Sequence, residues 1–283
     1  MSLNGQVCIV TGATSGVGKA TALELARRGA TVGIVARDPE RARLVADEIA
    51  RAGGGRRADV FLADLGAQRE VRRAANEILA RCPRIDVLVN NAGVVHLKRT
   101  TTVDGIEATF AVNHLAYFLL TRLLLDRLRE SAPARIVNVA SEAHKFVRGI
   151  QFDDIGFQRS YRAMRVYGHS KLANLLFSQE LARRLEKTGV TVNSVHPGAV
   201  ASSLGKNNGR VAQVLIGLLV PFFRTPEQGA ATSIHVATAP ELTGVTGRYF
   251  KNCREARPAA AASDAAAARR LWELSDGLTG LAS

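Results

Sequence analysis

The sequence has few cysteines for its length, and those it has are scattered. Cys8, Cys82 and Cys253 are the only three among 283 residues. An odd number of widely separated cysteines neither builds a disulfide framework nor has the spacing of a zinc site. Thiols of this kind fit a reducing compartment, so we expect the protein to be cytoplasmic.

The sequence also shows no signature of a signal peptide or of a membrane-spanning helix. Residues 1–6 have no basic stretch followed by an apolar stretch, which is the signature of a signal peptide. The longest apolar run, Val211–Phe223, contains Gln213 and Pro221 and is too short to cross a bilayer. We therefore expect no transmembrane segment.

Aromatic residues are scarce, at 5%, whereas positive charge is abundant. Lysine and arginine outnumber aspartate and glutamate by 38 to 25, which gives a net charge of +13. No basic run is interleaved with aromatic residues, so we expect a solvated basic surface and no nucleic-acid partner. The histidines lack metal-ligand spacing, so no metal site is expected. They are His96, His114, His144, His169, His196 and His235.

Short β-rich runs alternate with helical patterns, and most runs are continuously apolar, as in a parallel sheet covered by helices on both faces. The predicted strands are Val7–Thr11, Thr31–Ala36, Ala58–Leu62, Asp86–Asn90, Arg135–Ala140 and Thr191–His196. The predicted helices between them are Lys19–Arg28, Glu40–Ala52, Ala67–Ala80, Gly105–Glu130 and Tyr167–Lys187. This alternation predicts an α/β fold with a single doubly wound, Rossmann-like parallel sheet, and one domain over residues 1–283.

The alternation ends after His196. Within residues 199–225, a polar stretch at Gly205–Arg210 precedes the apolar run Val211–Phe223. We interpret residues 199–225 as a substrate-binding loop and helix inserted in the domain. Further helices are expected to open at Pro226 and to carry Arg269–Trp272.

A glycine-rich loop, Thr11–Gly18, joins the first predicted strand to the first predicted helix. Its glycines allow a close approach to a pyrophosphate, and the helix N-terminus offers free N–H groups. A glycine triplet alone would be a tight turn, but its place between strand and helix favours dinucleotide binding. The candidate binding residues here are Gly12, Thr14, Ser15, Gly16, Val17 and Gly18.

The end of the second predicted strand indicates which dinucleotide binds. An NAD site usually carries a carboxylate there, whereas this strand ends in Ala36 and Arg37. A guanidinium is suited to a ribose 2′-phosphate, so NADP(H) is favoured. The alternative is that Arg37 caps a surface turn and Asp38 supplies the acid.

Four motifs in order resemble the short-chain dehydrogenase/reductase family. They are Thr11–Gly18, Asn90-Asn91-Ala92-Gly93, Tyr167-Gly168-His169-Ser170-Lys171 and Pro197-Gly198. Longer stretches resemble its retinol dehydrogenase branch, and the resemblance then covers nearly the whole chain: Tyr167–Asn174, Ala182–Leu185 and Arg269–Trp272. Ala140 is a mild departure, because relatives often carry another serine there.

Tyr167 and Lys171 are four residues apart on a predicted helix, so both side chains emerge on one face. A nearby cation lowers the pKa of a tyrosine, which can then exchange a proton with a carbonyl or alcohol oxygen. Ser141 closes a strand at the carboxyl edge of the sheet, where its hydroxyl can bind the same oxygen. A structural Tyr–Lys pair and a simple turn serine are the alternatives.

The resemblance implies further roles. Asn113 would support a proton path through water to Lys171, although an asparagine within a helix can instead cap a neighbouring carbonyl. Asp64 and Leu65 would flank the adenine. The cofactor cleft would be lined by Asn91, Ala92 and Gly93, and its nicotinamide end by Pro197, Gly198, Val200 and Ser202.

We therefore predict an NADP(H)-dependent oxidoreductase that interconverts a carbonyl and an alcohol by hydride transfer. The apolar run Val211–Phe223 favours a lipophilic small-molecule substrate; the alternative is that it packs on the core or forms a subunit or membrane-surface contact. An alternative is reduction of a carbon–carbon double bond, because protochlorophyllide reductases resemble the same branch. A second is a non-catalytic NADP(H)-sensing or partner-binding protein, which the combination of Asn113, Ser141, Tyr167 and Lys171 argues against. Relatives are often dimers or tetramers, so a homo-oligomer is possible.

Overall fold

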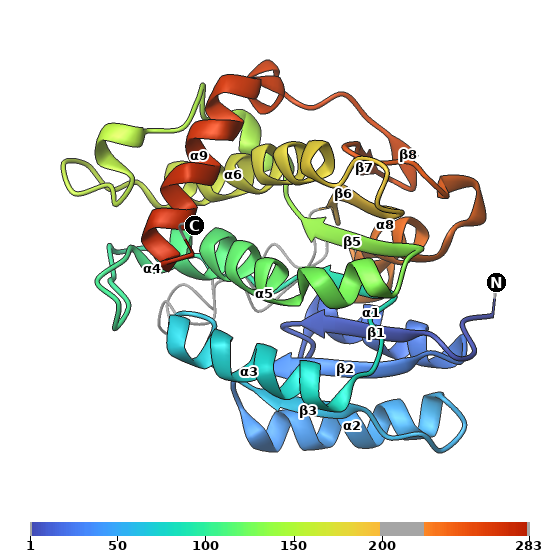
Figure 1. The fold of residues 1–283 in the computed structure, drawn as a ribbon. Coiled ribbons are helices and arrows are strands. Elements are labelled where there is room, and N and C mark those ends of the chain that lie inside the picture. Colours follow the sequence, from blue (N-terminus) through green and yellow to red (C-terminus); the bar gives the residue numbers. More distant parts are fainter. Residues whose placement is uncertain (1, 199–223, 282–283) are drawn as a thin grey trace.

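One eight-stranded sheet organises the chain (Figure 1). The computed structural model describes residues 2–198 and 224–281. The strand order is β3-β2-β1-β4-β5-β6-β7-β8, and all neighbours are parallel except β7 and β8. The strands are β1 (Val7–Thr11), β2 (Thr31–Ala36), β3 (Asp59–Leu62), β4 (Val87–Asn90), β5 (Ala134–Val139), β6 (Val190–His196), β7 (Tyr249–Lys251) and β8 (Arg254–Glu255). The predicted Rossmann-like fold is confirmed.

The six predicted strands are all present, and each end differs from the prediction by at most one residue. Strands β7 and β8 are additions to that prediction. They contain only three and two residues, which is too short for any hydrophobic period to be visible in the sequence.

Helices cover both faces of the sheet. Their bounds are α1 (Gly16–Arg27), α2 (Pro39–Ala52), α3 (Gln68–Arg81), α4 (Ala108–Phe110), α5 (Ala116–Glu130), α6 (Ala163–Arg184), α8 (Pro226–Thr238) and α9 (Ala265–Thr279). Buried side chains of α3, α5 and α6 pack on one face, and those of α1, α2 and α8 pack on the other.

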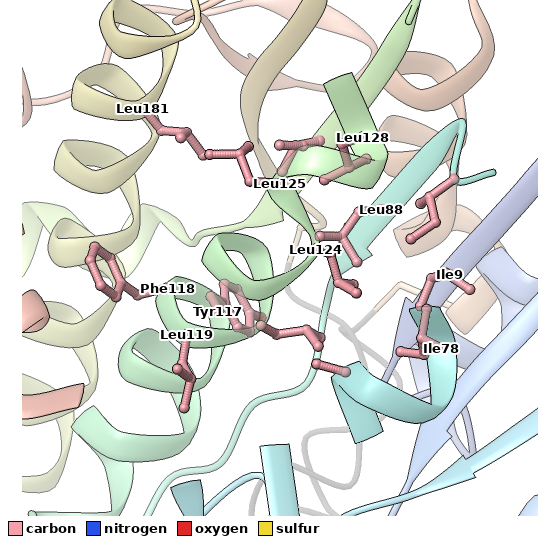
Figure 2. Close-up of a cluster of buried hydrophobic side chains, with 14 of the residues drawn as sticks. Ile9, Ile78, Leu88, Tyr117, Phe118, Leu119, Leu124, Leu125, Leu128 and Leu181 are labelled. Atoms are coloured by element: carbon pink, nitrogen blue, oxygen red, sulfur yellow. The ribbon is translucent and has the colours of Figure 1, made fainter. Parts of the chain in front are cut away.

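Strand β1 shows why the apolar runs are continuous. Its Ile9 side chain joins the cluster under α3 and α5, while Cys8 and Val10 join the opposite cluster. Figure 2 shows Ile9 beside Ile78 and Leu88 in the first cluster. Successive residues of a strand point to opposite faces. Because both faces are buried here, successive residues are all apolar.

The predicted helix Gly105–Glu130 is interrupted. A π-helical segment, η1 (Ala111–Leu115), separates α4 from α5 and contains Asn113. Ala108–Glu130 is long and apolar enough to cross a membrane by length and composition, but 83% of that apolar window is buried inside the molecule. The segment is therefore a core helix of the fold. π-Helical turns are rare and concentrate at functional sites.

Helix α9 braces the helices that carry the candidate site. The Trp272 ring packs edge-on against Phe118 of α5, with ring centroids 5.0 Å apart. The Arg184 guanidinium of α6 lies 4.2 Å from the centre of the same ring. Arg122 of α5 forms a 2.5 Å ion pair with Asp276 of α9. These contacts explain Trp272 of the late motif as a packing residue.

Candidate active site

The carboxyl ends of β1 to β6 open onto one pocket of about 300 Å³. The strand order reverses between β1 and β4, and such switch points form the ligand crevice of open α/β sheets. Seventeen predicted residues line this pocket: Gly12, Thr14, Ser15, Gly16, Val17, Gly18, Arg37, Asp64, Leu65, Asn91, Ala92, Gly93, Ser141, Tyr167, Lys171, Pro197 and Gly198. Two others, Val200 and Ser202, fall outside the described residues, as do positions 199–223 of the predicted substrate-binding insertion.

Two glycines of the loop have no room for a side chain. Gly12 has φ +66°, and a Cβ there would lie 2.7 Å from the Ala92 Cα. A Cβ on Gly18 would lie 2.5 Å from the Gly12 carbonyl oxygen and would also overlap the Asn91 amide. Helix α1 begins inside this loop at Gly16, with no acidic residue in its first turn. The cradle therefore fits a pyrophosphate, whose negative charge a helix N-terminus favours.

Asn91 fastens the glycine loop to the end of β4. Its side-chain Nδ2 donates to the Thr11 carbonyl oxygen at 2.9 Å. In return, the Thr11 Oγ1 accepts from the backbone N–H groups of Asn91 and Ala92, at 2.9 and 3.0 Å. The N-N-A-G motif thus fixes the shape of the cradle as well as lining it.

Positive charge collects where the pocket passes the end of β2. Arg37 follows β2, Arg41 lies in the first turn of α2, and both are exposed and line the pocket. Among the described residues neither guanidinium has an acidic partner. Asp38 does not line the pocket, and its carboxylate instead accepts from the Arg41 backbone N–H at 3.1 Å, capping α2. The β2–α2 turn therefore offers the pocket two cations and no carboxylate.

Arg41 is a site residue that the motif reasoning missed. Its place in the first turn of the predicted helix Glu40–Ala52 was the available signal, because that turn lies at the end of the second strand. Apolar residues complete the lining: Val35, Ala36, Ala63, Val94, Val112, Val139 and Ala140.

Ser141, Tyr167 and Lys171 meet at the other end of the pocket. The Lys171 side chain is 2% exposed, and its Nζ donates to the Val139 carbonyl oxygen at 2.8 Å. This nitrogen lies 5.7 Å from the centre of the Tyr167 ring and 5.6 Å from the centre of the Tyr117 ring. The Ser141 Oγ accepts from the Ala143 N–H at 3.2 Å. The spacing of four between Tyr167 and Lys171 does place both on the pocket side of α6.

Asn113 stands behind this group rather than in the pocket lining. Its Nδ2 donates to the Val94 carbonyl oxygen and to Ser170 Oγ, both at 3.0 Å, and its Oδ1 accepts from the Val94 N–H at 2.8 Å. Ser170 Oγ in turn donates to the Tyr167 carbonyl oxygen at 2.8 Å. The side chain therefore ties η1 to the segment after the N-N-A-G motif and to α6, and it caps no carbonyl of its own helix. The proposed water path to Lys171 stays a prediction.

Known proteins resemble the chain over its whole length. The family described as short chain dehydrogenase matches residues 6–212. Mouse retinol dehydrogenase 14 is 45% identical over 99% of this chain and 87% of its own length. Human retinol dehydrogenase 11 is 46% identical over 99% of this chain and 88% of its own length. The chain belongs to the short-chain dehydrogenase/reductase family.

Within that family it falls in the retinol dehydrogenase-like branch, as the motifs predict. A crystal structure of a short chain dehydrogenase from Burkholderia cenocepacia J2315 in complex with NADP is also similar. It has a TM-score of 0.71 and 29% identity, and the match covers 89% of this chain and 97% of that one. This short-chain dehydrogenase/reductase is therefore an oxidoreductase that acts on CH–OH or C=O groups.

Burial controls the protonation of the dehydrogenase's catalytic candidates. It raises the pKa of Tyr167 to about 12, although a hydrogen bond with Ser141 acts in the opposite direction. Burial also lowers the pKa of Lys171 to about 7. The predicted lowering of the Tyr167 pKa by Lys171 stays a prediction: burial raises the Tyr167 pKa in this structure, and the lysine is itself desolvated. At pH 7 Tyr167 is a phenol, which suits a proton donor.

Tyr117 is a second residue of this dehydrogenase that sequence reasoning missed. It is 1% exposed, its hydroxyl donates to the Ala92 carbonyl oxygen at 2.8 Å, and its ring flanks Lys171. The signal was its place four residues after Asn113 on one predicted helix. Tyr117 and Tyr167 enclose the lysine, and this aromatic enclosure contributes to its desolvation.

Proposed function

We propose that this enzyme reduces the carbonyl group of a lipophilic small molecule with NADPH, and oxidises the corresponding alcohol with NADP⁺. The observation that carries the proposal is the shared pocket, which has Ser141, Tyr167 and Lys171 at one end and Arg37 with Arg41 at the other. A non-catalytic sensor of NADP(H) would need only the arginine end. The convergence of three proton-handling groups supports an enzyme instead.

The residues divide the reaction between them. The Ser141 oxygen accepts a hydrogen bond from the Ala143 N–H, which fixes the hydroxyl at the pocket, where it can donate to the substrate oxygen. Tyr167 then gives its phenolic proton to that oxygen, and Lys171, whose Nζ lies 5.7 Å from the Tyr167 ring centre, would hold the cofactor ribose when the dinucleotide is bound. The dinucleotide, when bound, supplies or accepts the hydride. Binding of the reacting oxygen by Ser141 and Tyr167 becomes stronger as negative charge develops on it, which lowers the barrier.

The first prediction concerns cofactor choice. Changing Arg37 to alanine removes a charge-assisted pair with the 2′-phosphate, which should weaken NADPH binding about 10- to 100-fold. The affinity for NADH, which has no 2′-phosphate, should change less than about twofold. Titration of protein fluorescence with each cofactor measures both constants. Equal affinity of the unchanged enzyme for NADPH and NADH would overturn the proposal of NADP(H) specificity.

Two control variants separate the effect of the Arg37 charge from the effects of neighbouring charged residues on α2 and at its N-terminus. Arg43→Ala removes an exposed guanidinium of α2 that pairs with Glu40 and Asp47 and does not line the pocket. It should leave NADPH affinity unchanged. Asp38→Ala removes the cap of α2 and should cost about 1 kcal/mol of stability without altering the affinity for NADH. Loss of NADH binding in Asp38→Ala would restore the alternative that Asp38 holds the ribose.

The second prediction concerns the substrate. The pocket lining includes the apolar Val94, Val139 and Ala140, and the relatives named above are retinol dehydrogenases. With straight-chain aldehydes of increasing length, kcat/KM should rise by up to about fourfold per methylene, because each buried CH₂ contributes about 0.8 kcal/mol. The rise should end where the pocket is full. Steady-state NADPH oxidation measures the series, and a flat or falling series would contradict a lipophilic pocket.

A further inference from the structure

The segment that follows Ser141 touches both halves of the catalytic group. It forms the short helix η2 (Glu142–Phe146), which begins directly after the serine. The Ala143 N–H holds the Ser141 Oγ, as described above. The Ala143 carbonyl oxygen lies so close to Gly168 that a Cβ there would overlap it. Gly168 neighbours Tyr167, so the placement of η2 sets the distance between the serine and tyrosine hydroxyls.

His144 lies in this segment and is fully buried. Its Nδ1 is 2.6 Å from the Ser141 carbonyl oxygen, which also accepts from the His144 backbone N–H at 3.1 Å. Its Nε2 accepts from the Ala259 backbone N–H at 3.0 Å. The ring packs edge-on against Tyr249, with centroids 5.4 Å apart. Both ring nitrogens are therefore used, one on the catalytic segment and one on the C-terminal segment.

The partners of His144 fix its tautomer. Burial lowers the pKa of His144, so the ring is neutral at physiological pH and carries one N–H. The Ala259 N–H is a donor and needs a bare nitrogen, which places the ring proton on Nδ1. Nδ1–H then donates to the Ser141 carbonyl oxygen. The Ala259 backbone N–H thus determines which nitrogen of His144 carries the proton.

A second set of side-chain contacts links η2 to strand β7. The Glu142 carboxylate accepts from the Tyr249 hydroxyl at 2.7 Å and from the Lys251 ammonium at 3.1 Å, both in β7. Strand β7 and the chain that follows it therefore brace η2 through the side chains of Glu142 and His144. Glu142 fixes the outer edge of η2, while His144 is the one that reaches back to the backbone of Ser141.

We propose that His144 is a positioning residue that holds Ser141 against the reacting oxygen, with Ala259 selecting the tautomer that does so. The inference rests on the proposed function, because it assigns Ser141 to the reacting oxygen. His144 does not line the pocket that the described residues form. Its loss should reduce kcat and leave cofactor binding intact, a split that a general loss of stability would not produce.

Two amide side chains separate the functions of the two ring nitrogens. The amide NH₂ of asparagine lies where Nδ1 lies, so His144→Asn keeps the donor to Ser141. The amide of glutamine reaches the position of Nε2, so His144→Gln keeps only the acceptor for Ala259. We expect kcat within about threefold of the unchanged enzyme for His144→Asn. For His144→Gln and His144→Ala, kcat should fall about 10- to 100-fold, the cost of misplacing a catalytic group by about 1 Å. NADPH affinity should stay within about twofold in all three.

His169→Ala is the matched control. His169 is equally buried and also accepts from a backbone N–H, that of Gln151 at 3.0 Å, but it makes no hydrogen bond to Ser141. It should lose thermal stability without the selective loss of kcat. Unchanged kcat in His144→Gln, or equal losses in His144→Asn and His144→Gln, would overturn the proposal. If His144→Ala does not fold, the Asn–Gln comparison still decides.

A second measurement does not depend on turnover. Histidine ¹⁵N chemical shifts of the folded enzyme report the tautomer directly, and we expect Nδ1–H for His144. An Nε2–H tautomer would overturn the inference whatever the substrate is. Absence of carbonyl reduction by the unchanged enzyme, with the Nδ1–H tautomer present, would instead count against the proposed function and leave the histidine geometry standing.

Discussion

Tyr167→Phe should lower kcat for carbonyl reduction about 10²- to 10⁴-fold, the usual contribution of a positioned proton donor. The variant loses only the phenolic hydroxyl, while the ring that flanks Lys171 is kept. NADPH affinity should therefore stay within about twofold. Steady-state NADPH oxidation gives the rate, and fluorescence titration gives the affinity. The loss should be present at every pH from 6 to 9, since burial keeps the pKa of Tyr167 near 12 and the residue acts as a phenol throughout.

Tyr161→Phe is a suitable control for this change. The Tyr161 hydroxyl donates to the His96 carbonyl oxygen at 2.9 Å, and the residue does not line the pocket. Its removal should leave kcat within about threefold. Near-full carbonyl reduction by Tyr167→Phe would exclude Tyr167 as the proton donor. Reduction of an enone to the saturated ketone, with the carbonyl intact, would then favour the double-bond hypothesis.

Most of the fold could be predicted because its signals are local. Continuous apolar runs bounded by turns mark the buried strands, and the glycine loop and the Tyr–Lys spacing mark two ends of one pocket. The topology then brings residues as distant as Gly12 and Lys171 together, because parallel strands end at a common edge.

The remaining features depend on contacts that no local pattern reports. The π-helical segment around Asn113 lies within a uniform helical period, and only its bonds to Val94 and Ser170 explain it. The same is true of His144, whose partner Ala259 is 115 residues away. Protonation is a further such feature: spacing places a cation beside Tyr167, but burial, which sequence does not quantify, shifts the pKa of both groups.

Lys171→Met should lower catalytic efficiency. It should also remove the pH dependence of the unfolding free energy that the buried lysine causes. The lysine lies beside the Tyr167 ring and is expected to bind the cofactor ribose, so kcat/KM should fall about 10²- to 10³-fold, as when one preorganised donor is removed. NADPH affinity should fall as well, in contrast to Tyr167→Phe. The same steady-state and titration measurements distinguish the two variants.

The effect of Lys171 on stability follows from its low pKa in the folded protein. Burial lowers that pKa to about 7, whereas an unfolded lysine titrates near 10.4. Between these values the unfolded chain binds more protons than the folded one, so the stability of the unchanged enzyme rises with pH across this window. Below about pH 7 the lysine is charged in both states, and the cost of burying that charge is present in full.

The difference in unfolding free energy between the unchanged enzyme and Lys171→Met isolates this one group. It should rise from pH 7 to pH 10 with a slope of at most about 1.4 kcal/mol per pH unit, and it should be flat below pH 6. Urea unfolding at each pH measures it. The control is Lys98→Met, which removes an exposed lysine and should give a difference that does not vary with pH. A flat difference for Lys171→Met as well would mean that Lys171 keeps an ordinary pKa in its place between Tyr117 and Tyr167. The desolvated site described here would then be wrong, and with it the reason why Tyr167 remains a proton donor at neutral pH.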